Sequence, residues 1–189
     1  MDVYTAEELG PWDLLGLRIA YAAQKKSKDR STQVGAALMS PDHTTIIPGY
    51  NGFPARVADD PAVLSKEEGY AIPDKWKDLT NLTEANWIDP IIYTVPFQDA
   101  DITKNDLVIH AEQNCILHCP QRPIGWTLYC THIPCSDRCS PLIVAAGIER
   151  VVCVAAKGNS DMGYNKTATI LLLGSVTLAL VKDFPLNYR

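Results

Sequence analysis

The chain has 189 residues, of which 47% are hydrophobic, enough for one domain with a substantial core. Its formal net charge of −5 argues against binding to a polynucleotide, which favours a basic surface. No run approaches the roughly 20 apolar residues of a membrane span, and the acidic N-terminal stretch lacks the apolar core of a signal peptide. We therefore expect a cytoplasmic protein that binds neither nucleic acid nor membranes, with six cysteines that are reduced or metal-bound.

The first 54 residues predict one helix and two strands. A proline at position 11 and apolar residues at helical spacing predict a helix at about 11–27. Its main apolar stripe is Trp12, Leu15, Ile19 and Ala22, widened by Leu14, Leu17 and Tyr21. A strand is expected at 34–39, then a turn at 40–43 and a paired β-branched strand at 44–47. Residues 49–54 read as a glycine-punctuated loop.

Residues 54–107 are rich in Pro, Asp and Asn and show no clear periodicity. A compact domain seldom contains a bare loop of this length. We therefore expect an insertion, made of short ordered pieces, within a single domain that spans residues 1–189.

The remaining residues alternate between helical and strand patterns. Helices are predicted at 110–118, 139–146 and 167–173, and strands at 127–132, 150–155 and 176–181. Pro141 suits the start of the second of these helices, and Gly147 suits its end. Together with the first 54 residues, this order predicts a three-layer α/β fold.

The strongest chemical signal combines His110, Glu112, Cys135 and Cys139. One imidazole and two thiols make a good ligand set for a catalytic zinc, which needs three protein ligands and one open position. Glu112 lies two residues from His110 and is suited to carry protons. A closed structural zinc site or simply buried cysteines are the alternatives, but neither needs Glu112.

The spacing departs from the H-x-E and P-C-x-x-C signature of zinc deaminases, because three residues separate Cys135 from Cys139. If Cys135 lies in the opening turn of a helix, position i+4 still brings both sulfurs to one metal. Both ligand segments then lie at helix N-termini, where the helix dipole favours thiolates. The backbone N–H of Ala111 or Glu112 is also placed to meet a substrate carbonyl.

The chain resembles the cytidine and deoxycytidylate deaminase superfamily over most of its length apart from the insertion and the first ten residues. The HAE triplet at 110–112 and the PC pair at 134–135 are shared across the superfamily. The deoxycytidylate branch is indicated by SKDRSTQVGA at 27–36 and GYNGFP at 49–54. The resemblance implies a cytidine-deaminase-like fold, with a central five-stranded mixed sheet flanked by helices.

The resemblance also implies an activity, namely zinc-dependent hydrolysis of dCMP to dUMP with release of ammonia. Zn²⁺ would be held by His110, Cys135 and Cys139, with Glu112 moving protons between water and the cytosine ring. Asn51 matches the asparagine that contacts the sugar in related deaminases, and Ala111 is a further substrate-binding residue. The family further implies a homo-oligomer, with a hexamer favoured.

Regulation is a further expectation, with dCTP activating, dTTP inhibiting and Mg²⁺ accompanying the triphosphate. The effector site is expected at Lys28, Arg30, Tyr50, Asn51, Gly52, Phe53 and Arg56. A shaping role in the substrate pocket is the alternative for this stretch. Cations suited to the substrate phosphate are Lys28, Arg30, Arg56, Arg138 and Lys166, and the sequence does not select among them.

Four alternatives stay open at this point. His132 is a less favoured zinc ligand, and Cys115 with Cys119 can hold a second, structural zinc, although buried reduced thiols fit them better. A nucleic-acid-editing deaminase is a rival function, disfavoured by the acidic composition. A non-catalytic zinc-stabilised nucleotide-binding module is the other rival, disfavoured by Glu112.

Overall fold

The computed structural model describes residues 2–27, 29, 32–54, 107–155, 161–182 and 184–185. The chain divides into two compact units, one made of Met1–Gly52 with Ile109–Arg189 and the other of Phe53–Val108. The named helices and strands all belong to the first unit. The insertion expected at 54–107 lies, apart from its ends, outside the described residues.

The first unit is built on a mixed six-stranded sheet with strand order β1-β6-β5-β4-β2-β3. β2 is antiparallel to both β3 and β4, whereas β4, β5, β6 and β1 run parallel. The strands are β1 Asp2–Thr5, β2 Gly35–Met39, β3 Ile46–Tyr50, β4 Thr127–Cys130, β5 Arg150–Val154 and β6 Thr177–Lys182. The α/β class and the cytidine-deaminase-like plan are confirmed.

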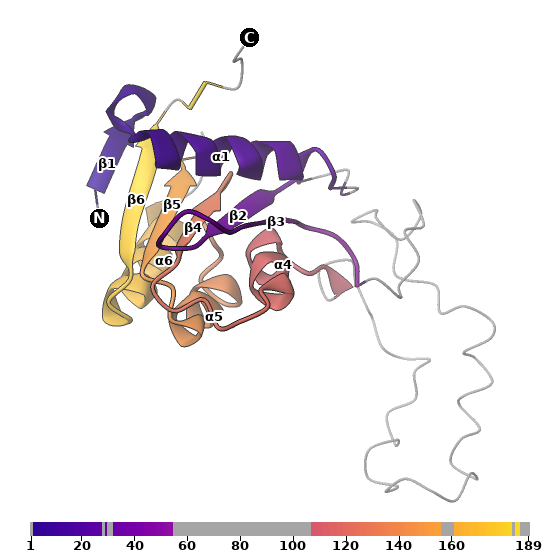
Figure 1. Cartoon of the computed structure of the whole chain (residues 1–189). Coiled ribbons are helices and arrows are strands. Elements are labelled where there is room, and N and C mark those ends of the chain that lie inside the picture. The colour runs from indigo at the N-terminus through magenta and orange to yellow at the C-terminus, as the bar shows by residue number, and fades with distance from the viewer. Residues whose placement is uncertain are drawn as a thin grey trace, which may run out of the picture. The chain divides into compact units, whose positions relative to one another are not determined.

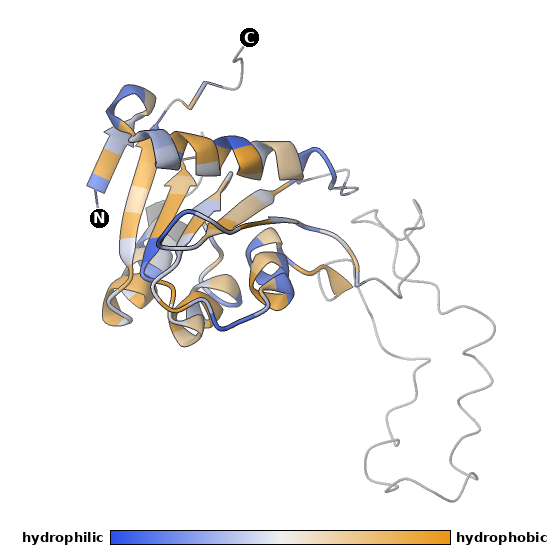
Figure 2. Ribbon diagram, in the orientation of Figure 1, coloured by the Kyte–Doolittle hydropathy of each residue, from blue (hydrophilic) through white to orange (hydrophobic). Residues whose placement is uncertain are grey.

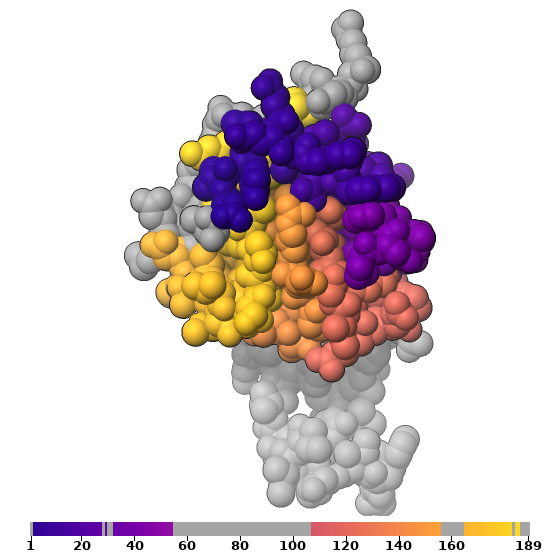
Figure 3. Space-filling model, turned by 60° about the vertical axis from the view of Figure 1, so that its left-hand side comes forward, coloured from indigo at the N-terminus to yellow at the C-terminus, as the bar shows by residue number. Residues whose placement is uncertain are grey.

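The predicted number of five strands is wrong, because β1 adds a sixth at one edge of the sheet. Three of its four residues are exposed, so it has no alternation of buried and exposed positions for a sequence pattern to detect. β1 is held by parallel pairing with β6, and Figure 3 shows these two strands side by side, where indigo meets yellow.

Helices cover both faces of the sheet (Figure 1). One face carries α1, Pro11–Gln24, which follows the short 3-10 helix η1, Ala6–Glu8. The other carries α4 Ala111–His118, α5 Cys139–Ala146 and α6 Asp161–Leu173. None of the helices in the described part of the chain is long and apolar enough to cross a membrane.

Successive strand residues feed two separate hydrophobic cores, because side chains alternate between the faces of a sheet. Leu38, Leu128 and Val151 belong to the core beneath α4, α5 and α6. Their neighbours Met39, Tyr129 and Val152 belong to the core beneath α1. Figure 2 shows the resulting hydrophobic colour along the central strands. Strands buried on both faces need two layers of helices, as the three-layer prediction required.

The predicted apolar stripe of α1 is wrong in its orientation. Trp12 and Leu15 are 47% and 36% exposed, whereas the helix buries Gly16, Leu17, Ala20 and Ala23. Gly16 lies so close to the ring of Tyr129 that a Cβ there would come within 2.4 Å of it. Small residues let α1 approach the sheet closely. The helix therefore turns its small residues toward the sheet, and the large side chains of Trp12 and Leu15 stay on its exposed side.

Apart from the start of α6, the other predicted boundaries agree to within three residues. α4 begins one residue after His110, and α5 has the predicted bounds, ending at Gly147 with the positive φ of 84° that favours glycine. α6 begins at Asp161, six residues before the predicted start. β3 starts and ends later than expected, so its last two residues, Gly49 and Tyr50, come from the stretch read as a loop.

Candidate metal and catalytic site

The N-terminus of α4 positions His110 and Glu112. His110 is the N-cap residue, and its backbone N–H donates to Oε1 of Gln113 over 2.9 Å. The residue before it, Ile109, exchanges two backbone hydrogen bonds with Gly52, of 3.1 and 2.9 Å. Asn114 Nδ2 also donates to the carbonyl of Tyr50 over 2.6 Å. The start of α4 is therefore fixed against the end of β3.

A turn between β4 and α5 positions the two sulfurs. Thr167 Oγ1, from α6, donates to the Pro134 carbonyl over 2.9 Å. The backbone N–H and the hydroxyl of Ser140 both donate to the Cys135 carbonyl, over 2.9 and 2.8 Å. The expected place of Cys135 in the opening turn of the helix is wrong, because α5 begins at Cys139. The backbone bond from Ser140 to Cys135 closes a wide six-residue turn, which accommodates the extra residue.

Three donor atoms converge on one point. His110 Nδ1 lies 3.4 Å from the Cys135 sulfur and 3.3 Å from the Cys139 sulfur, and all three atoms lie within 4.8 Å of one another. Tetrahedral zinc, with Zn–N near 2.0 Å and Zn–S near 2.3 Å, spaces nitrogen from sulfur by about 3.5 Å. The donor set therefore fits Zn²⁺ with one coordination position left for water. Within the described residues no other group of three His, Cys, Asp or Glu side chains converges this way.

Hydrogen bonds within this group shift the pKa values of the two thiols in opposite directions. A hydrogen bond from the Cys139 thiol, helped by one from His110, lowers the pKa of Cys135 to about 5. The Cys139 backbone N–H also donates to the Cys135 sulfur over 3.2 Å. The same thiol–thiolate hydrogen bond, together with burial, raises the pKa of Cys139. The lowered pKa of Cys135 therefore comes from these hydrogen bonds and not from a helix terminus, and the thiolate expected at Cys139 is disfavoured.

Glu112 is an ionisable side chain in a nearly closed environment. Only 3% of it is exposed, although it lies in the first turn of α4. Burial raises the pKa of its carboxyl group, and the nearby His110 opposes that shift. A carboxyl group whose pKa is moved toward neutrality can both accept and return a proton under ordinary conditions. The first-turn N–H groups beside it, including that of Ala111, have no acceptor within the helix.

The alternative metal ligands lie apart from this group. His132 Nδ1 lies 3.2 Å from the hydroxyl of Thr131, and burial lowers its pKa. The Cys115 thiol is buried and donates to the Ile47 carbonyl. Cys119 is a free thiol at the C-cap of α4. In the described part of the chain, neither His132 nor the Cys115–Cys119 pair joins a three-residue donor cluster.

Asn51 lies at the end of β3, between two residues that contact the α4 region. Its side chain is 5% exposed and is held by the segment that follows α1. Oδ1 accepts from the Val34 N–H over 2.8 Å, and Nδ2 donates to the Thr32 carbonyl over 2.8 Å. Tyr50 beside it is 44% exposed.

The candidate cations are only partly described. Lys28, Arg30 and Arg56 lie outside the described residues. Arg138 is exposed at the N-cap of α5, between the two cysteine ligands in sequence, and Lys166 is exposed on α6. Arg138 thus lies near the candidate metal ligands in sequence, and the structure does not select the group that binds phosphate.

Sequence reasoning missed the supporting residues Gln113, Ser140 and Thr167. The position of Gln113, three residues after the helix N-cap, is a capping-box signal that could have been recognised. Ser140 follows a ligand directly but carries no comparable pattern. Thr167 is distant in the sequence, and only the packing of α6 against the Pro134 turn shows its role.

Sequence comparison with known proteins matches the part of the chain that carries the candidate metal site. The model of the cytidine and deoxycytidylate deaminase zinc-binding region matches residues 11–155. The deoxycytidylate deaminase of Mycobacterium phage D29 is 34% identical over 142 residues, covering 75% of this chain and 92% of the relative. A probable deoxycytidylate deaminase of Drosophila melanogaster is 31% identical over 161 residues, covering 85% and 67%.

One solved structure is similar over most of the chain. The dCMP deaminase of cyanophage S-TIM5, crystallised in complex with dCMP and dUMP, gives a TM-score of 0.59 at 21% identity. The match covers 92% of this chain and 99% of that chain. At this level of identity the likeness supports the fold alone.

Proposed function

Because the chain belongs to the cytidine and deoxycytidylate deaminase family, we propose that it catalyses the zinc-dependent hydrolysis of dCMP to dUMP with release of ammonia. The observation that carries the proposal is the convergence of His110 Nδ1 and two cysteine sulfurs beside the buried carboxyl group of Glu112. The relatives at 31% and 34% identity, which bear the name deoxycytidylate deaminase, support the choice of substrate.

Each residue of the group has a distinct role in this proposal. His110, Cys135 and Cys139 hold Zn²⁺, which lowers the pKa of a water molecule enough to make it a nucleophile near neutral pH. Glu112 removes a proton from the attacking water and delivers it to N3 of the cytosine ring, and it then assists proton transfer to the leaving amine at C4. The closed environment of Glu112 keeps bulk water from competing for that proton.

Two residues at the ends of β3 and α4 position the nucleotide in this proposal. Asn51 contacts the sugar, and the backbone N–H of Ala111 donates to the pyrimidine carbonyl. The bridge between Gly52 and Ile109 supports this arrangement, since it joins the segment that carries Asn51 to the segment that carries His110.

We further propose regulation by dCTP as activator and dTTP as inhibitor, each accompanied by Mg²⁺. The site comprises Lys28, Arg30, Tyr50, Asn51, Gly52, Phe53 and Arg56. The hydrogen bond from Asn114 to the Tyr50 carbonyl supports a route for coupling, because a shift of that loop acts directly on α4. An effector acts only through different affinities for two arrangements, typically about 1–3 kcal/mol.

The remaining proposals concern organisation. The whole chain acts as one deaminase domain with an insertion at about 54–107, and the protein forms a homo-oligomer, with a hexamer favoured. We place it in the cytoplasm, because none of the six cysteines forms a disulfide, as expected in a reducing compartment.

Ammonia release tests the proposed function. The zinc-loaded protein and its Glu112→Gln variant are incubated with dCMP, CMP, deoxycytidine and a cytosine-containing oligonucleotide. We expect rapid release from dCMP by the parent alone and much less from the other three. Release from the oligonucleotide but not dCMP would indicate an editing enzyme, and binding of dCMP without any release would indicate a binding module.

The regulatory proposal is tested by dCMP turnover at subsaturating substrate with each triphosphate and Mg²⁺. Opposite shifts by dCTP and dTTP are expected, and Lys28→Ala and Arg30→Ala should weaken both shifts. Simple competition with dCMP as the whole effect of both triphosphates would refute a separate effector site.

A further inference from the structure

A buried polar network surrounds Asn51, and most of it is not explained by zinc chemistry. Ser27 and Asp29, which are 5% and 4% exposed, lie in the segment between α1 and β2. Ser27 Oγ donates to the Asn51 backbone carbonyl over 3.0 Å, and the Asn51 N–H donates to the Val34 carbonyl over 3.1 Å. This segment therefore holds the backbone of Asn51 from both sides, besides contacting its side chain.

The contacts of the Asn51 amide fix its orientation. The Val34 N–H can only donate, so it must meet Oδ1, and the Thr32 carbonyl can only accept, so it must meet Nδ2. Nδ2 also donates to Asp29 Oδ2 over 3.3 Å. If the amide were rotated by 180°, Nδ2 would face the Val34 N–H, donor against donor. Oδ1 would then face the Thr32 carbonyl and the Asp29 carboxylate, acceptor against acceptor.

Counting donors and acceptors shows what remains for a ligand. An amide nitrogen has two hydrogens, and Thr32 and Asp29 take both of them. The amide oxygen has two lone pairs, of which Val34 uses one among the described residues. Asn51 can therefore offer a substrate an acceptor, but no donor.

Both carboxylate oxygens of Asp29 accept hydrogen bonds that maintain this arrangement. Its Oδ1 accepts from the Thr32 N–H over 3.1 Å while its Oδ2 accepts from Asn51. A carboxylate can accept at both oxygens at once, whereas an amide at this position has only one oxygen. Burying a charged group is unfavourable unless it is hydrogen-bonded, so these contacts argue for a role beyond filling space.

We propose that Asp29 is a positioning residue for substrate specificity: it fixes the Asn51 amide so that Oδ1 accepts a hydrogen bond from a sugar hydroxyl. This inference rests on the proposed function, in which Asn51 contacts the sugar of dCMP. The 3′-hydroxyl is the only hydroxyl on that sugar, since the 5′ position carries phosphate. The pocket therefore selects deoxynucleotides that carry a 3′-hydroxyl over those that lack it.

The test compares kcat/KM for dCMP with that for 2′,3′-dideoxycytidine monophosphate, which lacks only the 3′-hydroxyl. The parent should favour dCMP by roughly tenfold or more, as expected when a buried acceptor is left unpaired. Asp29→Asn should reduce this ratio about three- to tenfold, mainly through KM for dCMP, with zinc content unchanged. In an Asn51→Ala background, Asp29→Asn should have no further effect on the ratio.

Ser27→Ala is the backbone control, because it removes the hydroxyl that donates to the Asn51 carbonyl and accepts from the Asp29 N–H, while the contacts of the Asn51 amide and the Asp29 carboxylate stay in place. It should lower stability while the substrate ratio stays at the parent value. If Asp29→Asn does not fold, Asp29→Ser replaces it. A serine hydroxyl can still accept from the Thr32 N–H but is too short to reach Asn51, so the same fall in the ratio is expected.

The outcomes separate this inference from the proposed function. Equal turnover of dCMP and the dideoxynucleotide by the parent overturns the inference and leaves dCMP deamination standing. An equal loss for both substrates in the Asp29 variants also overturns it, because that result indicates a purely structural role. Absence of ammonia release from dCMP by the zinc-loaded parent overturns both.

Discussion

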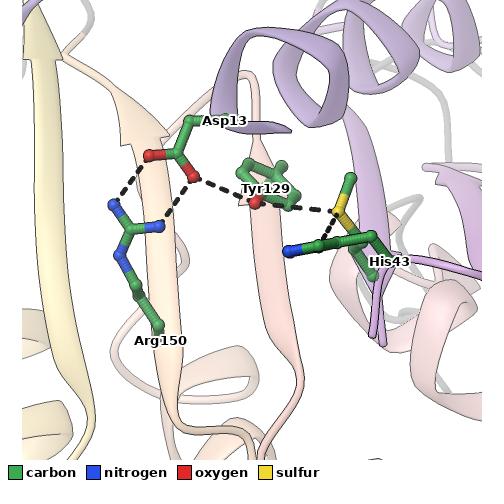
Figure 4. A network of polar contacts seen from close by, with 5 residues as sticks. Asp13, His43, Tyr129 and Arg150 are labelled. Carbon is green, nitrogen blue, oxygen red and sulfur yellow. Dashed lines mark hydrogen bonds and ion pairs between the residues drawn. The ribbon is translucent and has the colours of Figure 1, made fainter. Parts of the chain in front are cut away.

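Asp13 and Arg150 form a two-point ion pair across the inner side of α1, with Nη1–Oδ1 and Nη2–Oδ2 distances of 2.6 and 2.9 Å. Figure 4 shows that the Tyr129 hydroxyl joins the same carboxylate, donating to Oδ1 over 3.0 Å. The Met39 sulfur contacts both the Tyr129 hydroxyl and the ring of His43, which lies in the β2–β3 turn. The network ties the first turn of α1 to β4 and β5, on the face of the sheet opposite α4.

Asp13→Asn should lower the free energy of unfolding by about 2 kcal/mol, because it breaks a partly buried charge pair and leaves Arg150 without its counter-ion. Urea denaturation measures the change. Tyr129→Phe is the matched variant and should cost about 1 kcal/mol, since it removes the hydroxyl contacts with Asp13 and Met39 but leaves the Asp13–Arg150 ion pair in place. Zinc content should be unaffected in both, and loss of zinc from folded Asp13→Asn protein would contradict the separation of the two faces.

Glu112→Gln should retain zinc and fold but lower kcat for dCMP by roughly 10²–10⁴-fold, since an amide cannot carry the proton. The measurement is steady-state ammonia release beside metal analysis of the same sample. Turnover within a few-fold of the parent, with zinc bound, would exclude Glu112 as the proton carrier.

Cys135→Ala and Cys139→Ala should each lower zinc content from about one ion per chain to near zero at chelator concentrations that leave the parent loaded, and should lower the melting temperature. Metal analysis and thermal unfolding with and without added zinc provide the readout. Cys115→Ser is the control, since its thiol contacts Ile47 and not the donor cluster. Normal zinc binding by Cys139→Ala would remove Cys139 from the ligand set.

Gly49→Ala should destabilise the protein by about 1–3 kcal/mol, the usual range for overpacking. A Cβ at this position would lie 2.4 Å from the Ala111 carbonyl oxygen and 2.6 Å from the Cys115 sulfur, so β3 and α4 would have to separate. Zinc affinity should fall as well, because His110 caps that helix.

Gly52→Ala serves as the stability control, because the nearest atom to its added Cβ lies 3.8 Å away on the flexible ring of Tyr50. Chemical denaturation of the two variants side by side should separate them clearly. A Gly49→Ala protein as stable as Gly52→Ala would show that the two elements can move apart without cost.

The sequence predicted best where local chemistry decides the structure. Pro141 and Gly147 mark the start and end of α5, and the convergence of His110 with the two cysteines follows from motif spacing. The buried face of α1 could not be predicted, because it depends on the contact between Gly16 and Tyr129, residues far apart in the chain. The polar contacts of Asn51 were equally out of reach, since the amide is satisfied by a segment whose conformation is not periodic.

The parallel pairing of β1 with β6 has a consequence for how the chain is made. Val3 pairs with Leu180, so β1 must wait for β6, which is made much later in synthesis, before it can dock. Pairing across so long a stretch carries a large loop-closure entropy and belongs late in folding. Until then β6 presents an open edge, which another chain can occupy. Removing residues 2–5 should therefore leave the zinc site intact while increasing aggregation during synthesis.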